Sequence, residues 1–263
     1  MIKAVSVTDV GKRRQLNQDI VFASEKTLGQ LPNVFIVADG MGGHNAGDYA
    51  SRYTVEVIVD RIKNDPVQDP EQAIREAIET ANWKIREAAQ ADDSLSGMGT
   101  TVVVATYLEG VLKVANVGDS RLYVIGQEIR QITRDHSLVE EMIRMGGIDR
   151  NSARNHPDKN IITRAIGAQK SVEIDFFEVN LLSGEVVLMC SDGLTNMLTD
   201  EEILSILRRQ QPISEKADEL IKAANNNGGR DNIAVILIDP FAENSAVQPR
   251  GTSADSSQAG RFQ

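Results

Sequence analysis

Residues 100–133 contain four short apolar stretches with only two or three residues between them. The stretches read TTVVVATY, VLKVANV, RLYVI and EIRQIT, and the separators read LEG, GDS and GQ. Parallel neighbours in a sheet need a crossover of a dozen or more residues, whereas antiparallel neighbours need only a short turn. The spacing therefore predicts an antiparallel meander and argues against a chain built from βαβ units.

Helical patterns lie on both sides of these strands. Apolar residues at helical spacing predict a helix over 46–63, and Pro70 followed by good helix formers predicts a second over 70–91. Further helices are expected at about 137–146, after the capping box of Thr199 and Glu202, and over 213–227. Further strands are expected at 33–38, 172–179, 185–190 and 232–238. We therefore expect an α+β fold, in which helices cover two packed, mainly antiparallel sheets.

Two stretches fall outside this regular pattern. Residues 144–160 are polar and contain glycine, which is typical of a surface loop or flap. The end of the chain is rich in Ser, Gly, Gln and Pro, which is typical of a flexible tail. We expect one domain over 1–240 and a tail over 241–263.

Charge and composition narrow the class of protein. The formal net charge of -10 argues against a broad surface for nucleic acid or for an anionic membrane. No apolar stretch approaches the ~18 residues of a membrane helix, and Cys190 is the single cysteine. We expect a cytoplasmic monomer that binds neither nucleic acid nor membrane. A site for an anionic substrate would then need arginines or bound cations.

Aspartate followed by glycine ends two of the apolar strands, in VFIVADGMGGH at 34–44 and in VLMCSDG at 187–193. Asp119 and Asp231 lie in similar glycine-containing contexts, and Asp9 and Asp19 lie near the start. Each aspartate alone is explained as a turn residue or a helix cap. As a set at strand ends they predict a converging cluster. Two unit charges ~4 Å apart repel by roughly 4 kcal/mol at an effective dielectric near 20, so the cluster would need cations. Oxygen ligands favour Mg²⁺ or Mn²⁺.

The glycines of GMGGH do not form a known phosphate loop. No Gly-Lys-Ser/Thr follows them, and the third glycine of a dinucleotide fingerprint is missing. A close approach of the backbone to a metal explains them better.

Taken together, these stretches resemble the PPM (type 2C) family of metal-dependent protein Ser/Thr phosphatases in its compact bacterial form. The resemblance implies a four-layer α-β-β-α sandwich, which agrees with the pattern of elements. It rests on motifs that occur in the family's order within residues 1–240: TDVGKRRQLNQD, VADGMGGHNAGDYAS, GMGTTVVVA, ANVGDSRLY, ITRDHS, ITRAIG, CSDGLTNML and GGRDNIAVI.

The resemblance implies a set of metal ligands. Asp39 is expected to bridge two Mn²⁺ or Mg²⁺ ions, and the carbonyl of Gly40 to bind one of them. Asp192 and Asp231 are expected to complete the shell of the first ion. Asp119 resembles the ligand of a third, weaker ion shared with Asp192. The implied reaction is hydrolysis of phosphoserine or phosphothreonine by a metal-activated water, with no phosphoenzyme.

The resemblance also implies roles around the metals. Arg14 is expected to bind the substrate phosphate with a bidentate fork, since guanidinium matches phosphate oxygens. Gln18, Asp19 and Asn232 are expected to surround the metal ligands without binding metal directly.

Two positions depart from the family pattern. Residue 18 is Gln where the family usually has Glu, so the second metal has one charge fewer nearby. Residue 41 is Met where some relatives have the histidine that protonates the leaving group. His44 is the nearby histidine, and two roles remain open for it: the acid that protonates the leaving group, or a structural hydrogen-bond donor. The candidate catalytic residues are therefore Arg14, Asp39 and His44.

Three functions are compatible with these residues. The leading one is an active phosphatase that acts on phosphorylated proteins and opposes a bacterial Ser/Thr kinase. The alternative is a pseudophosphatase, which binds phosphoproteins without turnover, and Gln18 is its only support. A purely structural metal-binding domain is the third, and it leaves Arg14 unexplained.

Overall fold

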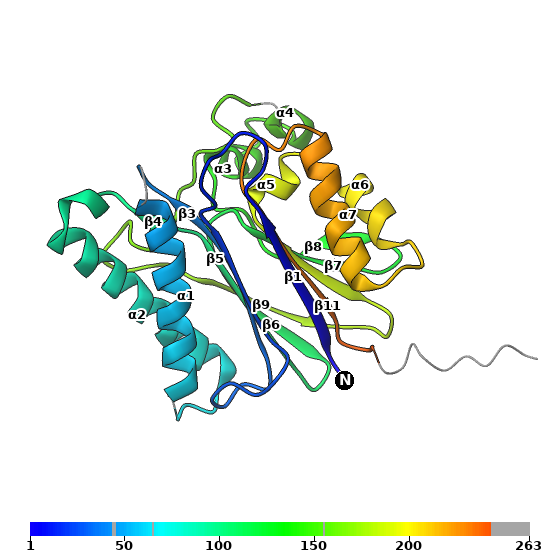
Figure 1. Ribbon diagram of the computed structural model, residues 1–263, viewed down its shortest axis with the longest axis horizontal. Coiled ribbons are helices and arrows are strands. Elements are labelled where there is room, and N and C mark those ends of the chain that lie inside the picture. The colour runs from blue at the N-terminus through cyan, green and yellow to red at the C-terminus, as the bar shows by residue number, and fades with distance from the viewer. Residues whose placement is uncertain (44–45, 65, 155, 243–263) are drawn as a thin grey trace, which may run out of the picture.

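The computed structural model describes residues 1–43, 46–64, 66–154 and 156–242, and two antiparallel sheets pack face to face at its centre (Figure 1). The first sheet has the order β1 (Lys3–Asp9), β11 (Ile233–Asp239), β10 (Val186–Cys190), β7 (Arg121–Ile125) and β8 (Ile129–Gln131). The second has the order β2 (Asp19–Ser24), β3 (Val34–Met41), β5 (Val102–Leu108), β6 (Val111–Val117) and β9 (Asp175–Asn180), and β4 (Gly99–Thr100) pairs with β3.

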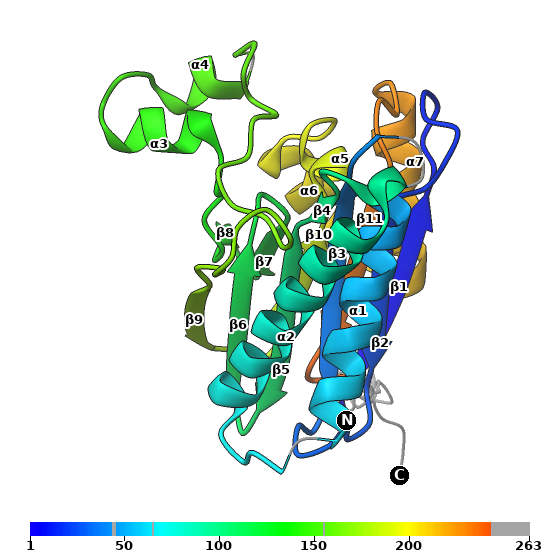
Figure 2. The same ribbon diagram turned by 90° about the vertical axis from the view of Figure 1, so that its left-hand side faces the viewer.

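Helices cover the outer face of each sheet. The second sheet is covered by α1 (Ala46–Asn64) and α2 (Pro70–Ala91), followed by the short 3₁₀ turn Asp93–Leu95. The first sheet is covered by α5 (Asp192–Thr195), α6 (Asp200–Leu207) and α7 (Ile213–Asn226). Two short helices, α3 (Leu138–Arg144) and α4 (Arg150–Arg154), project from one end of the sandwich (Figure 2). The predicted four-layer α-β-β-α sandwich is confirmed.

The apolar runs of the central strands follow from burial on both faces. In β3, Val34 and Ile36 pack against α1 and α2, while Phe35 and Val37 pack between the sheets. Strands β10 and β11 alternate in the same way between the inner layer and the helices α5 to α7. A strand buried on both faces has no polar side to display, which is why these stretches read as continuous runs.

The predicted helices over 46–63 and 70–91 are confirmed, and so is the capping box of Thr199 and Glu202. The single four-stranded meander is wrong at one link. Strands β5 and β6 pair in the second sheet, whereas β7 and β8 pair in the first. The chain crosses between the sheets at 118–120, because β6 and β7 are both central strands with other partners, β9 and β10.

The sequence analysis did not predict β1 and β2. Each strand pairs on one side only, β1 with β11 and β2 with β3. Their side chains are mostly half-buried or exposed, so they lack the apolar run that marks the central strands. The alternating sequence KAVSVTD of β1 was the available signal.

The predicted flap over 144–160 is a polar segment that contains the helix α4. Its neighbour α3 begins after Ser137, whose hydroxyl accepts a hydrogen bond from the Glu140 amide at 3.3 Å. The predicted tail over 241–263 lies outside the described residues from 243 onward. None of the described helices is both long and apolar enough to cross a membrane.

Candidate active site

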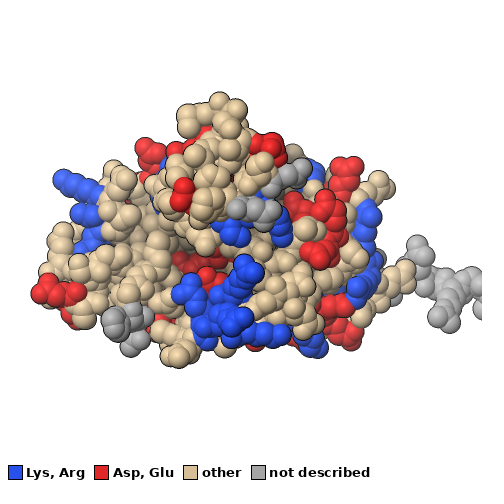
Figure 3. All heavy atoms as spheres, turned by 90° about the horizontal axis from the view of Figure 1, so that it is seen from above, with Lys and Arg blue, Asp and Glu red and all other residues tan. Residues whose placement is uncertain are grey.

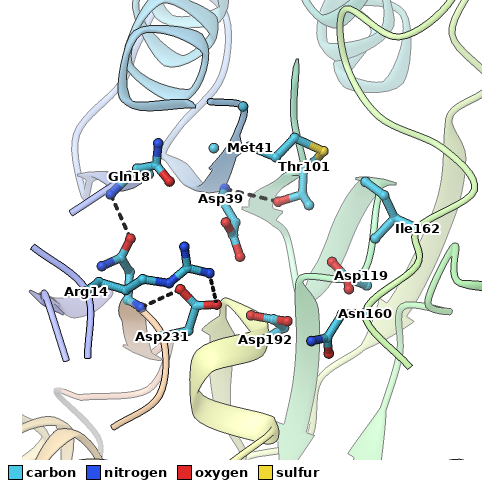
Figure 4. Close-up of a pocket in the computed structure, with 13 residues that line it drawn as sticks. Arg14, Gln18, Asp39, Met41, Thr101, Asp119, Asn160, Ile162, Asp192 and Asp231 are labelled. Carbon is cyan, nitrogen blue, oxygen red and sulfur yellow. Dashed lines mark hydrogen bonds and ion pairs between the residues drawn. The ribbon is translucent and has the colours of Figure 1, made fainter. Parts of the chain in front are cut away.

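Four aspartates from four chain segments line one cavity at the end of the sandwich that carries α3 and α4 (Figure 4). Asp39 lies in β3, Asp192 opens α5 directly after β10, Asp231 lies just before β11, and Asp119 lies at the crossing between the sheets. The cavity has a volume of about 260 Å³, and Arg14 lies at its edge. The convergence expected for these strand-end carboxylates is therefore what the fold produces.

The glycines beside two of these aspartates are required by close backbone packing. A Cβ on Gly40 would lie 2.0 Å from the carbonyl oxygen of Gly47 at the start of α1. A Cβ on Gly193 would lie 1.8 Å from the carbonyl oxygen of Asn232. Each glycine thus lets a second segment of the site pack directly against the strand end that carries the aspartate. This packing gives both Asp-Gly pairs a structural reason that does not involve a metal.

We expect Gly193→Ala to lower the free energy of unfolding by at least about 1–3 kcal/mol, since the added methyl would meet backbone that cannot move independently. Chemical denaturation of the metal-free protein measures this change. Gly43→Ala is the matched control, because its Cβ would have no atom within 4 Å. Equal stability of the two variants would contradict the packing argument.

The backbone of Asp39 is held by two threonines that the sequence analysis did not single out. The Asp39 amide donates to Thr101 Oγ1 at 3.0 Å, and the Thr101 amide donates to the Asp39 carbonyl at 2.9 Å. The Thr100 hydroxyl also donates to that carbonyl, at 2.9 Å. Thr101 further shares a hydrogen bond of 2.8 Å with Ser120, next to Asp119. The polar pair at the start of an otherwise apolar strand was the signal for these residues.

Asp192 and Asp231 each have one oxygen held by a neighbouring side chain. Asn196 Nδ2 donates to Asp192 Oδ2 at 2.8 Å, and Arg14 donates to Asp231 Oδ2 at 2.8 Å. Asp231 Oδ1 accepts from the Asn232 amide at 2.9 Å. These contacts fix the two carboxyl groups on the side of the cavity opposite Asp39 (Figure 4).

Asn232 joins three segments beside the cavity. Its side-chain oxygen accepts from the Gln18 amide at 2.9 Å, and its side-chain nitrogen donates to the carbonyls of Val10 and Leu16 at 3.0 and 2.9 Å. The Gln18 carbonyl in turn accepts from the Ser51 hydroxyl at 2.6 Å and from the Gly40 amide at 3.0 Å. Asn232 and the backbone of Gln18 therefore position the loop that carries Arg14.

Desolvation and mutual repulsion raise the pKa values of the clustered carboxyl groups. Burial raises the pKa of Asp39 well above its usual range, and the charges of Asp19, Asp192 and Asp119 raise it further. Burial, with the charges of Asp192 and Asp135, raises the pKa of Asp119 well above its usual range. Burial, with the charge of Asp231, raises the pKa of Asp192 to about 6. Without added positive charge, the protein therefore disfavours the ionised cluster.

Asp19 lies behind Asp39, as its cross-strand partner in β2, and does not line the cavity. Its Oδ2 accepts from the Ser191 hydroxyl at 2.6 Å, while its buried Oδ1 has no hydrogen-bond partner. Burial raises the pKa of Asp19 to about 7. Asp9, counted with the set in the sequence, holds the Gly11 amide and the Asn225 side chain instead and does not line the cavity.

The oxygen atoms that line the cavity are suitable ligands for a divalent cation. They carry excess negative charge in a partly desolvated cavity. In their present positions, no three His, Cys, Asp or Glu side chains of the described residues surround a point that could hold an ion. Such a set fits a hard cation such as Mg²⁺, whose shell commonly includes water beside the carboxylates. His44 lies outside the described residues.

Arg14 provides positive charge at the cavity edge. Its side chain is 51% exposed, and its hydrogen bond to Asp231 raises its pKa. A second guanidinium edge therefore remains accessible from solvent. In the view onto this end of the molecule, the acidic hollow has Lys and Arg side chains beside it (Figure 3). An anion can thus approach a site whose centre is acidic.

Lining residues from 160–162 complete the cavity. Asn160 and Ile162 come from the segment that returns from α4 to the sandwich. The sequence analysis predicted the flap over 144–160 but did not place Asn160 or Ile162 in the site. No local pattern tells which residue of a loop faces inward.

Comparison with known proteins identifies the family of this chain. The family model described as Protein phosphatase 2C matches residues 11–237. The serine/threonine phosphatase stp of Listeria monocytogenes is 43% identical over 237 residues, which cover 88% of this chain and 93% of that protein. The crystal structure of Stp1 from Staphylococcus aureus is 36% identical, with a TM-score of 0.85 and coverage of 91% and 95%.

A further solved structure bears on the cavity. It is the catalytic domain of the serine/threonine phosphatase PstP in complex with two manganese ions, 31% identical to this chain, with a TM-score of 0.78 and coverage of 90% and 97%. From the matching model, the identity to named phosphatases and the shared fold, the chain belongs to the protein phosphatase 2C (PPM) family of protein serine/threonine phosphatases, in its bacterial form.

Proposed function

We propose that this phosphatase requires Mn²⁺ or Mg²⁺ and hydrolyses phosphoserine and phosphothreonine in proteins by attack of a metal-activated water. The observation that carries the proposal is the cavity where Asp39, Asp119, Asp192 and Asp231 meet beside Arg14. The raised pKa values of Asp39 and Asp192 support it, because bound cations would offset the burial and the repulsion that raise them.

Asp39, the Gly40 carbonyl, Asp192 and Asp231 would hold two ions in this cavity. Bound there, the ions would supply a nucleophilic water near neutral pH and offset negative charge on the transferring phosphoryl group. The family neighbour with two manganese ions supports this number. Asn196 and Asn232 hold ligand oxygens in place, so the carboxyl groups need little rearrangement to bind.

Arg14 binds the phosphate in this proposal. Its guanidinium is anchored at one edge by Asp231 and exposed at the other, so its remaining donors can form a fork with two phosphate oxygens. Because Asp231 is also a proposed metal ligand, a phosphate bound by Arg14 would lie beside the metals.

Phosphorylated proteins are the proposed substrates, and a Ser/Thr kinase that phosphorylates them is the proposed functional opponent. The alternative is a pseudophosphatase. Gln18 is the observation in its favour, since it lines the cavity with a neutral side chain. The four cavity aspartates and Arg14 favour turnover.

Hydrolysis of a phosphothreonine peptide by the purified protein separates these functions. We expect phosphate release with Mn²⁺ and its loss on addition of EDTA. A protein that bound the peptide but released no phosphate at any Mn²⁺ concentration would be a pseudophosphatase. Release that persists in EDTA would contradict the metal requirement.

We propose that Asp119 holds a third, weaker ion shared with Asp192. Asp119 lines both the cavity and a second depression that adjoins it. Its carboxyl group is buried and is repelled by the charge of Asp192. We expect Asp119→Ala to keep the fold and the two tight ions but to slow turnover of phosphopeptides. Calorimetric Mn²⁺ titration alongside kinetics tests this expectation. If the variant turned over phosphopeptides at the parent rate at all metal concentrations, Asp119 would be only a turn residue. If the variant lost the two tightly bound ions, Asp119 would have a structural role.

A further inference from the structure

A second depression adjoins the cavity and provides a path for the substrate chain. This groove has a volume of about 590 Å³, and it shares Asp119 and Asp192 with the cavity. One wall comes from α3, α4 and the segment after them, and the other from α5 and the start of α6. A peptide whose phosphorylated side chain reaches Arg14 and Asp39 would extend along it.

Three basic side chains border the cavity and this groove, and we name Arg154, Lys159 and Arg230 the basic rim. Arg154 and Lys159 line the groove, and Arg230 precedes Asp231. Burial and the charges of Arg154 and Arg230 lower the pKa of Lys159, while the charge of Asp192 raises it, so both arginines lie near Lys159. Blue side chains accordingly lie on two sides of the acidic hollow in Figure 3.

The basic rim has acidic neighbours, Asp192 for Lys159 and Glu201 for Arg154, but no direct pairing within the described residues. None of its three side chains forms a hydrogen bond or ion pair with another described residue. The other two bases that line the groove are paired: Arg150 contacts Glu140 at 3.3 Å, and Arg121 contacts Asp135 at 2.7 Å. In a chain with a net charge of -10, three cations without a direct ion pair around one opening point to an anionic ligand.

The two walls of the groove differ in charge. The wall opposite Arg154 and Lys159 includes Asp200 and Glu201. Hydrogen bonds to its own backbone and to Thr199, and then the charge of Arg154, lower the pKa of Glu201. Asp200 is engaged, since Tyr123 donates to it at 3.3 Å. Within the groove, a bound peptide would therefore meet unpaired positive charge along one wall.

We propose that the preferred substrates carry Asp or Glu residues on one side of the phosphorylated residue, and that the basic rim binds them. This inference rests on the proposed phosphatase function and adds a substrate class to it. A site bordered by positive charges attracts peptides with acidic residues and repels peptides with basic ones. Peptides with basic flanks should therefore be the poorest substrates.

The test compares phosphothreonine peptides that differ only in their flanks: neutral, acidic before the phosphothreonine, acidic after it, and basic on both sides. At low salt, we expect one of the two acidic peptides to have a kcat/KM about tenfold higher than that of the neutral peptide. A few exposed charge pairs have an effect of this size. The difference should shrink toward about 0.5 M salt, where the screening length is only a few ångströms.

The triple variant Arg154→Gln, Lys159→Gln, Arg230→Gln should remove this preference while hydrolysing p-nitrophenyl phosphate, which has no flank, at the parent rate. The control is Lys26→Gln, Lys63→Gln, two exposed lysines near the far ends of β2 and α1, and it should keep the preference. Equal kcat/KM for neutral and acidic peptides in the parent would overturn the inference, as would a preference that survives in the triple variant. Failure to hydrolyse any phosphopeptide would instead overturn the proposed function.

Discussion

Asp39→Asn is expected to lower kcat/KM for a phosphothreonine peptide by about a thousandfold or more, the scale of losing a metal that stabilises transition-state charge. Asp39 is the proposed bridge between two ions, and asparagine keeps its size while removing its charge. Steady-state kinetics at saturating Mn²⁺ measures the loss. Asp93→Asn changes an exposed aspartate beyond α2 and should have no effect.

The same variant should be more stable than the parent when both are metal-free. Desolvation and four neighbouring carboxylates disfavour the ionised Asp39, so removing its charge removes that penalty from the folded state. We expect the melting temperature in EDTA to rise by at least about 2 °C, which corresponds to roughly 1 kcal/mol in a domain of this size. In Mn²⁺ the order should reverse, because only the parent gains from bound metal.

This combination of lost activity and gained stability is specific to a cluster of repelling ligands. An Asp39→Asn protein that was inactive but less stable in EDTA would mean that Asp39 supports the fold. A protein that kept its activity would place the catalytic centre elsewhere.

Arg14→Ala is expected to lower kcat/KM for phosphopeptides by about 10- to 100-fold, the scale of a hydrogen bond to a charged group. Its side chain is half-exposed, so stability should change little while the phosphate loses its charged donor. Arg14→Lys should recover only part of the loss, because an ammonium cannot form a bidentate fork. The loss should appear as a higher KM as well as a lower kcat, since the phosphate is bound before it reacts.

Arg13→Ala is the matched control for this variant. Arg13 is an exposed neighbour in the same loop, and it does not line the cavity. If Arg13→Ala reduced activity as much as Arg14→Ala, the loop would act through its general positive charge. If Arg14→Ala matched the parent, Arg14 would be a surface residue paired with Asp231.

The central strands and long helices could be predicted from the sequence because their patterns arise from local burial. Residues 34–38 are buried on two faces, and α2 begins at Pro70 and is capped by Asp69, whose side chain accepts from the Gln72 amide. Edge strands such as β1 and β2 lack such a pattern, since only part of each is buried. Local spacing also did not reveal that the chain changes sheets at 118–120, because a short link can join either two neighbouring strands or two layers.

The cavity aspartates could be predicted because they recur as a set at strand ends and in glycine-containing contexts, although each alone would be explained as a turn residue or a helix cap. The residues that hold them could not. Thr101, Asn196 and Ser191 act through contacts across long stretches of chain or around a helix turn. Gly40 and Gly193 show the same limit: the sequence marks them as special, but only the fold shows that another backbone segment lies within 2.0 Å of the missing Cβ.

Calorimetric titration of Mn²⁺ into the metal-free protein tests most directly whether Asp39, Asp192 and Asp231 form a metal centre. The parent should bind two ions tightly, and Asp39→Asn and Asp192→Asn should each lose tight binding while remaining folded. Parent protein that binds no Mn²⁺ tightly, or variants that bind two ions as the parent does, would contradict the account.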